Sequence, residues 1–465
     1  MRNKRHYEIV GLIIGLVLLR GLIYGLLIPF DHAPDEKHHF LLIKAKQLQL
    51  RHASQDETQE TAARIEVAWR YLLFPESPKG RFAVEQFRGA LLPAPPSSLH
   101  LYYLVTGAML NVLSCEQIPH DIYALRGISI LCGALVVVLA IVIAGELFPD
   151  DLFLRFGIPI FIAFVPQFSA MNGVINNDKL AEVFASLLLW LLVKIFKHGL
   201  TWQYSAAYAA TAILALMSKR TTIFIIPLTL LAFVLYFWKG RLGLRLHLAL
   251  FGGIIGVTLL VYLLLWNETI YTLVHDHVIS IPEARYLPKK LLRPELFSSA
   301  TLLHIAKFFI VMYWGFWGIF GYMTIHLHHF WYLLAAFAQS LSIIGLLKII
   351  AQANTHVFSP FFRRADGAWK AKICYLFGAS VALSLIIPVF RSIILRFDAP
   401  DLTQGRYLFT VMIPVSVLTI FGLFALFPQK SHRWVGGIGL FSLILLDTVA
   451  LVNYLLLNFH YVAFF

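Results

Sequence analysis

The sequence predicts an all-α polytopic membrane protein, a bundle of about 11–13 transmembrane helices with a large first outer loop. Of its 465 residues, 59% are hydrophobic and only 14% are charged, whereas soluble proteins have roughly a quarter of their residues charged. Apolar runs of about 20 residues recur along the chain, and each could cross a hydrocarbon core of roughly 30 Å as a helix. Runs this long and uniform favour helices over a β-barrel.

The apolar runs define the predicted elements. The first run follows a basic start and lacks a small-residue cleavage site, so we interpret it as a retained span and not as a signal peptide. The sequence shows no repeat and no separate soluble domain, and residues 1–465 are predicted to form one membrane domain. The runs fall at about 8–30, 99–114, 122–148, 152–171, 179–197, 203–218, 221–238, 246–266, 301–325, 330–350, 372–396, 407–427 and 435–460.

Two hydrophilic segments are predicted to be outer loops. Residues 31–98 form the first extracytoplasmic loop, which contains a helix-like segment from Glu57 to Leu73 and is expected to lie at the membrane surface. Residues 267–300 form the second.

Lysine and arginine predict the orientation. The basic N-terminus is expected in the cytoplasm, together with the clusters at 239–245, 363–372 and 430–433, by the positive-inside rule. The net charge of +13 is then explained by loops near anionic lipid, and nucleic acid is not an expected partner. Counting spans between these clusters requires that run 99–114 does not cross, and that run 301–325 is re-entrant or interfacial. Run 99–114 has about 16 residues, which at roughly 1.5 Å each are too short for the core.

Four polar constellations then share the outer face. The first is Asp31 to His39, directly after the first span, where Pro34 fits the first turn of a helix and Asp31 could cap it. Asp35 and His39, four residues apart, would share a helix face and act as base and orienter, or hold a divalent cation. The alternative is a solvated cap at the end of a span.

The other three constellations lie at the mouths of later spans. Asn176-Asn177-Asp178 opens a span, and an ordinary helix cap is the alternative. Gln404-Gly405-Arg406-Tyr407 carries an arginine that could either snorkel to headgroups or neutralise a phosphate. The aromatic and glycine residues of 313–322 form either an interfacial belt or a groove for an isoprenoid chain or a sugar ring.

Three further features have simpler explanations. Arg20 lies within the first span, where an unpaired charge costs about 3 kcal/mol or more, so we predict a structural partner. The histidines of 326–329 are interpreted as a membrane-surface turn in preference to a metal cluster. Lys219 and Arg220 would lie outside, against the charge rule, and form a candidate phosphate-binding pair.

Taken in order, these motifs resemble the GT-C superfamily of glycosyltransferases, and within it the bacterial family catalogued as domain of unknown function 2142. The matching residues are Pro34-Asp35-Glu36 with His39 and Phe40, Asn176 to Asp178, Lys219 to Thr221, Phe316 to Tyr322, and Gln404 to Tyr407. Each motif is weak by itself, but five in order are fairly specific.

The resemblance implies a GT-C-like helix bundle in the bacterial inner membrane, and an inverting transfer of a sugar from a polyprenyl-phosphate donor to a glycan or lipid acceptor outside. Catalysis is then assigned to Asp35 as base, with Glu36 and Asp178. Substrate binding falls to His39, Asn177, Lys219, Arg220, Gln404, Arg406 and Tyr407. The cofactor is left open; a divalent metal could bind at Asp35, His39 and Asp178.

Two other functions remain open. A lipid-diphosphate-glycan polymerase or ligase would use the same kinds of residue, and a product assay separates it. A lipid-linked sugar transporter would show paired halves and ionisable residues at mid-membrane, and the sequence shows no such repeat.

Overall fold

The structure, a computed structural model, describes residues 2–73, 89–96, 100–114, 117–237, 299–354, 367–390 and 404–459. These residues are almost entirely helical, and six of their helices are long and apolar enough to cross a membrane. A bent pair, Leu152–Phe164 (α7) with Pro166–Asn172 (α8), makes a seventh if it is one span, and its two parts meet at 64°. The predicted polytopic, helical class is therefore confirmed.

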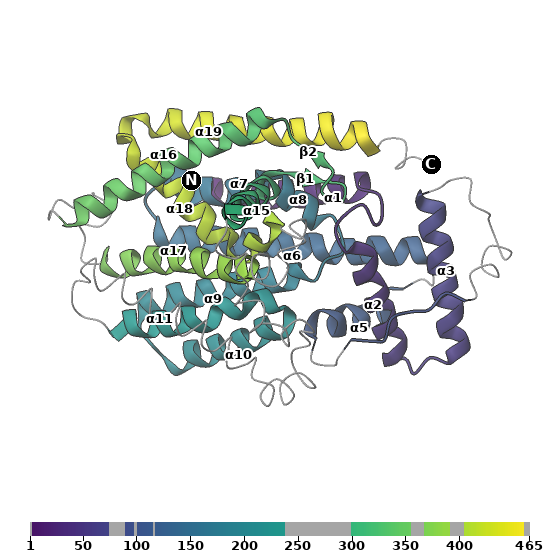
Figure 1. Ribbon diagram of the computed structural model, residues 1–465. Helices are drawn as coiled ribbons and strands as arrows, with labels where there is room; N and C mark the ends of the chain where they lie inside the picture. Colours follow the sequence, from purple (N-terminus) through teal and green to yellow (C-terminus); the bar gives the residue numbers. More distant parts are fainter. Residues whose placement is uncertain are drawn as a thin grey trace.

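The long helices lie roughly parallel across the view in Figure 1. They coincide with the predicted apolar runs, whose residues lack the polar interruptions that would end a helix. The apolar helices of the bundle, of which α11 has only 13 residues, are α1 (Arg2–Leu27), α6 (Ile118–Leu147), α9 (Asp178–His198), α10 (Trp202–Ser218), α11 (Ile225–Phe237), α16 (His329–Asn354), α17 (Gly367–Phe390), α18 (Met412–Leu426) and α19 (His432–Val449), which continues as the π-helical segment Ala450–Leu456.

The total of 11–13 spans stays a prediction. Three apolar helices among the described residues are shorter than a full span: Leu101–Leu113, Thr221–Phe237 and Leu303–Trp317. The predicted run at 246–266, nearly all of the second outer loop at 267–300, and the basic cluster at 239–245 lie outside the described residues.

Two runs predicted not to cross the membrane form short or crosswise helices. The helix α5 (Leu101–Leu113) has 13 residues, or about 20 Å at roughly 1.5 Å per residue, which is less than a hydrocarbon core. The helix α15 (Ser299–Trp317) is seen end-on in Figure 1, while α6, α9 and α17 run across the view. Whether either run crosses a membrane stays a prediction.

Run 301–325 does not stay helical to its end. After α15 the chain forms a small antiparallel hairpin, in which β1 (Ile319–Phe320) pairs with β2 (Ile325–His326). Tyr322, Met323 and Gly321 in its turn have positive φ, and the Tyr322 amide donates to the carbonyl of His32 at 3.2 Å. The aromatic-glycine segment is thus tied to the loop after α1.

Polar contacts join four helices at one end of the bundle. Arg155 at the start of α7 hydrogen-bonds His6 near the start of α1 at 3.2 Å. Lys194 near the end of α9 pairs with Glu146 at the end of α6. Helices α1 and α7 therefore begin at the end of the bundle where α6 and α9 finish.

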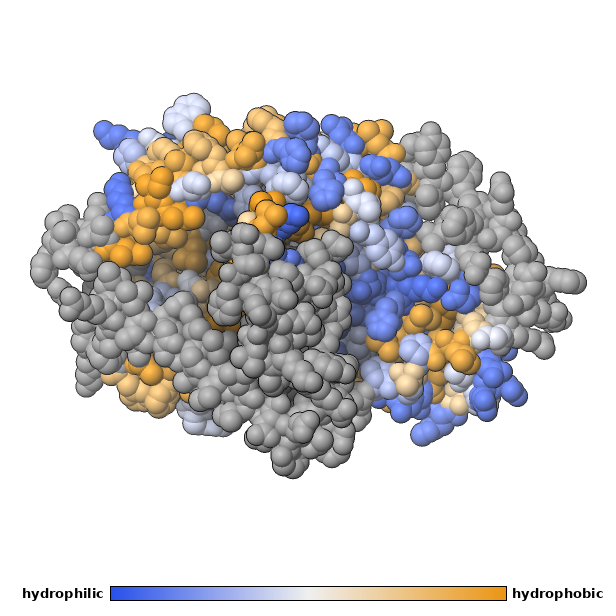
Figure 2. Space-filling model, viewed as in Figure 1, coloured by the Kyte–Doolittle hydropathy of each residue, from blue (hydrophilic) through white to orange (hydrophobic). Residues whose placement is uncertain are grey.

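The opposite end carries a separate small module. The helices α2 (Glu36–Leu50), α3 (Gln55–Leu73) and α5 pack on the N-terminal part of α6, around buried residues such as Phe40, Ile43 and Leu110. The helix predicted from Glu57 to Leu73 is confirmed as α3. Figure 2 shows hydrophilic residues gathered over this module, whereas hydrophobic residues prevail over α16 and its neighbours.

Arg20 has the structural partner that the sequence predicted. Its guanidinium forms a buried ion pair with Asp447 of α19 and donates to Ser169 at 2.9 Å. The Tyr24 hydroxyl donates to the same carboxylate at 2.7 Å. This network neutralises a charge inside the bundle and attaches α19 to α1.

Candidate functional site

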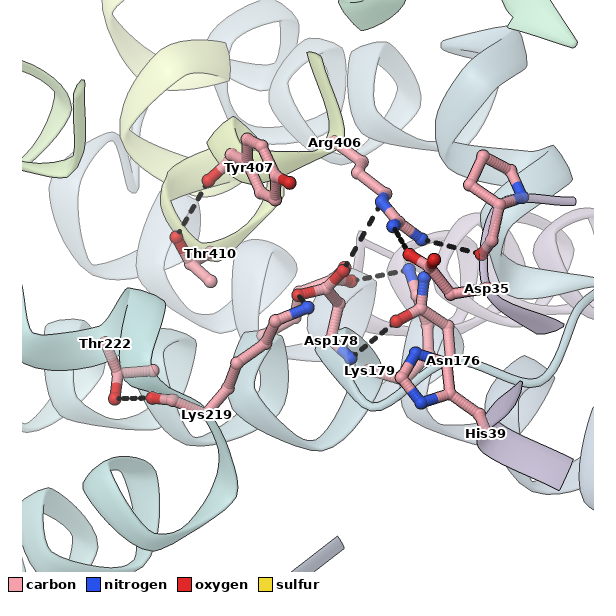
Figure 3. Close-up of polar contacts among 12 residues, drawn as sticks. Asp35, His39, Asn176, Asp178, Lys179, Lys219, Thr222, Arg406, Tyr407 and Thr410 are labelled. Carbon is pink, nitrogen blue, oxygen red and sulfur yellow. Dashed lines mark hydrogen bonds and ion pairs between the residues drawn. The ribbon is translucent and has the colours of Figure 1, made fainter. Parts of the chain in front are cut away.

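Four helix ends meet where the bundle joins the module formed by α2, α3 and α5. They bring together Asp35 before α2, Asp178 at the start of α9, Lys219 after α10, and Arg406 in the 3₁₀ segment Gly405–Val411 (η7) that leads into α18. Figure 3 shows their charged groups directed at one another. Four motifs that are far apart in the sequence therefore form one cluster.

Arg406 is the centre of this cluster. Its side chain is buried, with 4% exposed. Nη2 donates to Asp35 Oδ2 at 2.6 Å and Nη1 donates to the carbonyl of Pro34 at 3.2 Å, while Nε lies 3.8 Å from Asp178 Oδ2. A guanidinium fork suits such bridging, because it presents several donors in a fixed plane.

Asp178 and Lys219 form a second ion pair beside the first. The Lys219 ammonium contacts Asp178 Oδ1, and the Asp178 amide donates to the side chain of Asn176 at 2.9 Å. The N-cap residue of α9 is Asn177, whose side chain does not cap the helix, so the hydrogen bond to Asn176 is a local contact before the helix, while the carboxylate of Asp178 faces the cluster. The chain of charges runs Lys219, Asp178, Arg406, Asp35 and sums to zero.

Asp35 is the exposed member of the cluster. Its side chain is 56% exposed, and its backbone is left-handed, with φ of 65°. A non-glycine residue in this region is uncommon, and such conformations are held by their surroundings at functional sites. The carboxylate does not cap α2 but turns to Arg406, so that one carboxylate oxygen remains available to a ligand.

The local prediction for this loop was partly wrong. Helix α2 begins at Glu36, so Pro34 precedes the helix and does not lie in its first turn. The reason is the left-handed conformation at Asp35, which a helical turn cannot include. Asp31 does act as a cap, because its Oδ1 accepts from the Lys37 amide at 3.2 Å.

His39 lies behind Asp35 and is connected to α5. Its Nδ1 is 2.8 Å from the hydroxyl of Tyr103, and the same hydroxyl hydrogen-bonds the side chain of Asn177. Burial, and then the nearby Lys219 and Arg406, lower the pKa of His39 to about 3. The ring is therefore neutral at physiological pH, and it hydrogen-bonds Tyr103 at the side of the cluster.

Burial and the charges of Lys219 and Arg406 also shift the pKa values of the two aspartates. Burial raises the pKa of Asp178, but Lys219 and Arg406 outweigh it and hold the pKa below its ordinary value. Partial burial likewise raises the pKa of Asp35, and Arg406 reverses this. Burial lowers the pKa of Lys219 although Asp178 opposes it. Both aspartates are ionised at neutral pH.

Glu36 is placed differently from its neighbour Asp35. It is fully buried and its two oxygens accept from Arg126 at 2.9 Å each. Its carboxylate belongs to the packing between α2 and α6, whereas the motif pattern assigned it to catalysis. Arg126, which this arrangement requires, was not predicted from the sequence. The sequence did contain an indication of it, because an arginine inside the apolar run 122–148 requires a buried partner.

The Gln404 motif is held against the aromatic-glycine segment. A side chain at Gly405 would overlap the backbone of Gly315 and Phe316 in α15, so the two segments can touch only because both positions are glycine. Within the described part of the chain, the carbonyl oxygen of the Gln404 side chain is buried without a hydrogen-bond partner, as is that of Asn177. The Tyr407 carbonyl accepts from Thr410 at 3.3 Å. These contacts fix Arg406 between α15 and the Asp35 loop.

Two other predicted groups are placed less directly. Arg220 opens the 3₁₀ segment Arg220–Phe224 (η1), but its side chain is outside the described part of the structure. His326 ends β2, and His328 and His329 precede or begin α16, in agreement with the predicted surface turn.

The cluster does not fit the metal site suggested for Asp35, His39 and Asp178. Within the described ranges, no group of three or more His, Cys, Asp or Glu residues is arranged to hold a metal ion. The two carboxylates already face Arg406 and Lys219, and His39 Nδ1 faces Tyr103. The arrangement suits an anion between the two cations better than a cation.

No family model matches this chain, and no curated protein matches it. The resemblance to glycosyltransferases therefore rests on the five motifs, and the function must be argued from the site itself.

Proposed function

We propose that the protein is an inverting membrane glycosyltransferase that moves a sugar from a polyprenyl-phosphate donor to an acceptor on the outer face of the membrane. The observation that carries this proposal is the contact between Asp35 and Arg406. It joins an exposed carboxylate to a buried guanidinium at 2.6 Å. The pair offers a base and an anion-binding group within one site, which transfer from a phosphate leaving group requires.

The donor phosphate binds between Arg406 and Lys219. In the ligand-free site these cations are matched by Asp35 and Asp178. A phosphate that takes over the Nη2 contact of Arg406 releases Asp35, whose pKa then rises because its cationic partner is shared. Donor binding thereby converts Asp35 from a salt-bridged carboxylate into a usable base.

The transfer then follows from the positions of these groups. Asp35 accepts the proton of the acceptor hydroxyl, and the hydroxyl oxygen forms a bond to the anomeric carbon. The bond from that carbon to the phosphate oxygen breaks, and the polyprenyl phosphate leaves with the electron pair. Arg406 and Lys219 stabilise the leaving charge, Asp178 holds both cations in place, and attack from the opposite side inverts the anomeric carbon.

The outer location is supported by the direction of the helices. The charged cluster lies where α9 begins, α10 ends and η7 leads into α18, away from the contacts of His6 with Arg155 and of Glu146 with Lys194. The latter end holds the basic N-terminus and the Lys430 turn, which the positive-inside rule assigns to the cytoplasm. Lys219 is an exception to that rule, and its side chain contacts Asp178.

The proposal is tested with a strain that lacks the gene. It is complemented with the wild type, with Asp35→Ala, or with Asp56→Ala, which removes an exposed carboxylate from the first turn of α3. We expect Asp35→Ala to behave like the deletion: one sugar disappears from the envelope glycan and its monophosphate carrier lipid accumulates. Asp56→Ala should restore the wild-type pattern.

Other results of this complementation test would favour one of the two alternative functions. Accumulation of a lipid-diphosphate-linked glycan indicates a polymerase or ligase. Full complementation by Asp35→Ala refutes the catalytic assignment, and a transporter is then the better explanation.

A further inference from the structure

The ion pair between Glu36 and Arg126 is an almost completely enclosed charged contact beside the candidate site. The side chain of Glu36 has no exposed surface and that of Arg126 is 3% exposed. Nε and Nη2 of Arg126 donate to Oε1 and Oε2 of Glu36, each at 2.9 Å. Such a bidentate pair fixes the plane of the carboxylate as well as its position.

The remaining donors of Arg126 bind the end of α1. Nη1 donates to the carbonyl of Gly25 at 2.6 Å and to that of Ile28 at 2.8 Å. Helix α1 ends at Leu27, so these are carbonyls that lack a partner within the helix. Arg126 therefore holds α1, α2 and α6 together at one point.

Glu36 in turn binds both loops that carry the catalytic carboxylates. Oε2 accepts from the amide of Asp31 at 3.0 Å, in the loop that leads to Asp35. Oε1 accepts from the amide of Ile175 at 3.1 Å, three residues before Asp178. A single carboxylate thus receives one backbone hydrogen bond from each loop.

The segment before Asp178 also packs against the end of α1. A side chain at Gly173 would overlap the backbone of Gly25, so the segment before Ile175 lies directly against the last turn of α1. The contacts of Glu36 and Arg126 therefore lie beside a close backbone contact between this segment and α1.

We propose that Glu36 and Arg126 are a positioning pair that sets the separation of Asp35 and Asp178 across the Arg406 guanidinium. Neither residue contacts the substrate. The inference rests on the proposed transfer reaction for its kinetic consequence, but the coupling of the two loops is a separate physical claim. It also reassigns Glu36 from catalysis to positioning.

The molecule contains a matched control. Lys44 and Asp121 form a second buried ion pair, at 2.9 Å, between the same helices α2 and α6. Their contact touches neither the loop of Asp35 nor that of Asp178. If the Glu36 pair only attached α2 to α6, removal of either pair would have the same effect.

The first experiment measures hydrogen exchange in nanodiscs, which needs no substrate. The double variant Glu36→Gln with Arg126→Met is compared with Lys44→Met with Asp121→Asn. We expect the amides of Asp31 and Ile175 to exchange at least about tenfold faster in the first variant, both together, because their common acceptor is weakened. In the second variant both should stay at the wild-type rate.

The second experiment measures transfer from a synthetic polyprenyl-monophosphate sugar. For the Glu36–Arg126 variant, kcat should fall by about a hundredfold, as expected for a small misplacement of reacting groups. KM for the donor should change less than about threefold, because Arg406 and Lys219 remain. The Lys44–Asp121 variant should keep kcat within about twofold.

Two results overturn the inference. One is unchanged exchange at either amide in the Glu36–Arg126 variant, and the other is an equal kcat loss in both double variants. If the Glu36–Arg126 double variant does not fold, the single variant Arg126→Lys is used, because lysine keeps the charge but lacks the guanidinium fork. The amides of Asp31 and Ile175 should again exchange faster together. Exchange at the wild-type rate in Arg126→Lys would also overturn the inference. If the two amides exchange faster together in the variant but the wild-type protein transfers no sugar, the proposed function is refuted and the positioning of the two loops by Glu36 and Arg126 is retained.

Discussion

Arg406 donates a 2.6 Å hydrogen bond to Asp35, although 371 positions separate the two residues in the chain. The contact joins the loop after the first helix to the segment before α18. It also places the Asp35 carboxylate, the most exposed charged group of the cluster, against the buried Arg406 guanidinium at its centre. In the proposed function, a phosphate of the donor takes the place of the Asp35 carboxylate in this contact.

Replacing Arg406 by lysine tests whether the guanidinium fork is required. Lysine keeps the charge but cannot reach the Pro34 carbonyl, Asp35 and Asp178 together, because its donors share one atom. We expect transfer to fall by about a hundredfold or more, with a higher KM for the lipid-linked donor. Steady-state kinetics in nanodiscs measure both values. A wild-type KM in the Arg406→Lys variant would show that the phosphate binds elsewhere.

The neutral state of His39 predicts how stability depends on pH. Its pKa is about 3 in the folded protein, against an ordinary value of 6.5. The unfolded chain therefore binds more protons between these values, and stability is complete above about pH 6.5 and declines as the pH falls toward 3. Thermal unfolding of the wild type should show this decline, and His39→Gln should reduce it. An equal decline in both proteins would contradict the assignment.

The ion pair between Arg20 and Asp447 should be structural and not catalytic. Arg20→Met leaves Asp447 buried without its partner, and we expect a loss of about 3–5 kcal/mol in the free energy of unfolding. Arg20→Met combined with Asp447→Leu should recover most of that loss, because both charges are removed. Thermal unfolding in detergent measures this. Transfer by the folded double variant should remain near wild type, and its loss would give the pair a role in chemistry.

The close packing of Gly405 predicts a strong effect of one methyl group. Gly405→Ala forces a side chain into the backbone of Gly315 and Phe316, so the Arg406 segment must move. We expect transfer to fall by at least about tenfold. Gly378→Ala in α17 is the matched control, because nothing lies within 4 Å of its added carbon. The control should be neutral or slightly stabilised by its helix propensity, and equal losses in both would remove the packing explanation.

Periodic and compositional features of the fold were predictable from the sequence. Apolar runs identified the helices, whereas the prediction that the runs at 99–114 and 301–325 do not cross rests on the basic clusters and stays a prediction. The hairpin after α15 was not predicted, because turn geometry at Tyr322 and Met323 depends on contacts with the His32 loop. Local signals do not contain such contacts.

The site was predictable to the extent that its residues occur in motifs. Asp35, Asp178, Lys219 and Arg406 were all named, and the structure brings them together. The partners of buried charges were not predictable: Asp447 lies 427 residues from Arg20, and Arg126 lies 90 from Glu36. Pairing across such distances is decided by packing. The same argument that predicted a partner for Arg20 could have been applied to Arg126.

The central claim is that a donor phosphate displaces Asp35 from Arg406 and so frees it as the base. The most direct measurement compares donor binding and transfer in Asp35→Asn, using a labelled polyprenyl-phosphate sugar in nanodiscs. The account predicts opposite effects: transfer falls by at least about a hundredfold, while the donor binds as tightly as in the wild type or more tightly, because Arg406 has lost its competing carboxylate. Weaker donor binding together with the loss, or transfer that persists, would contradict it.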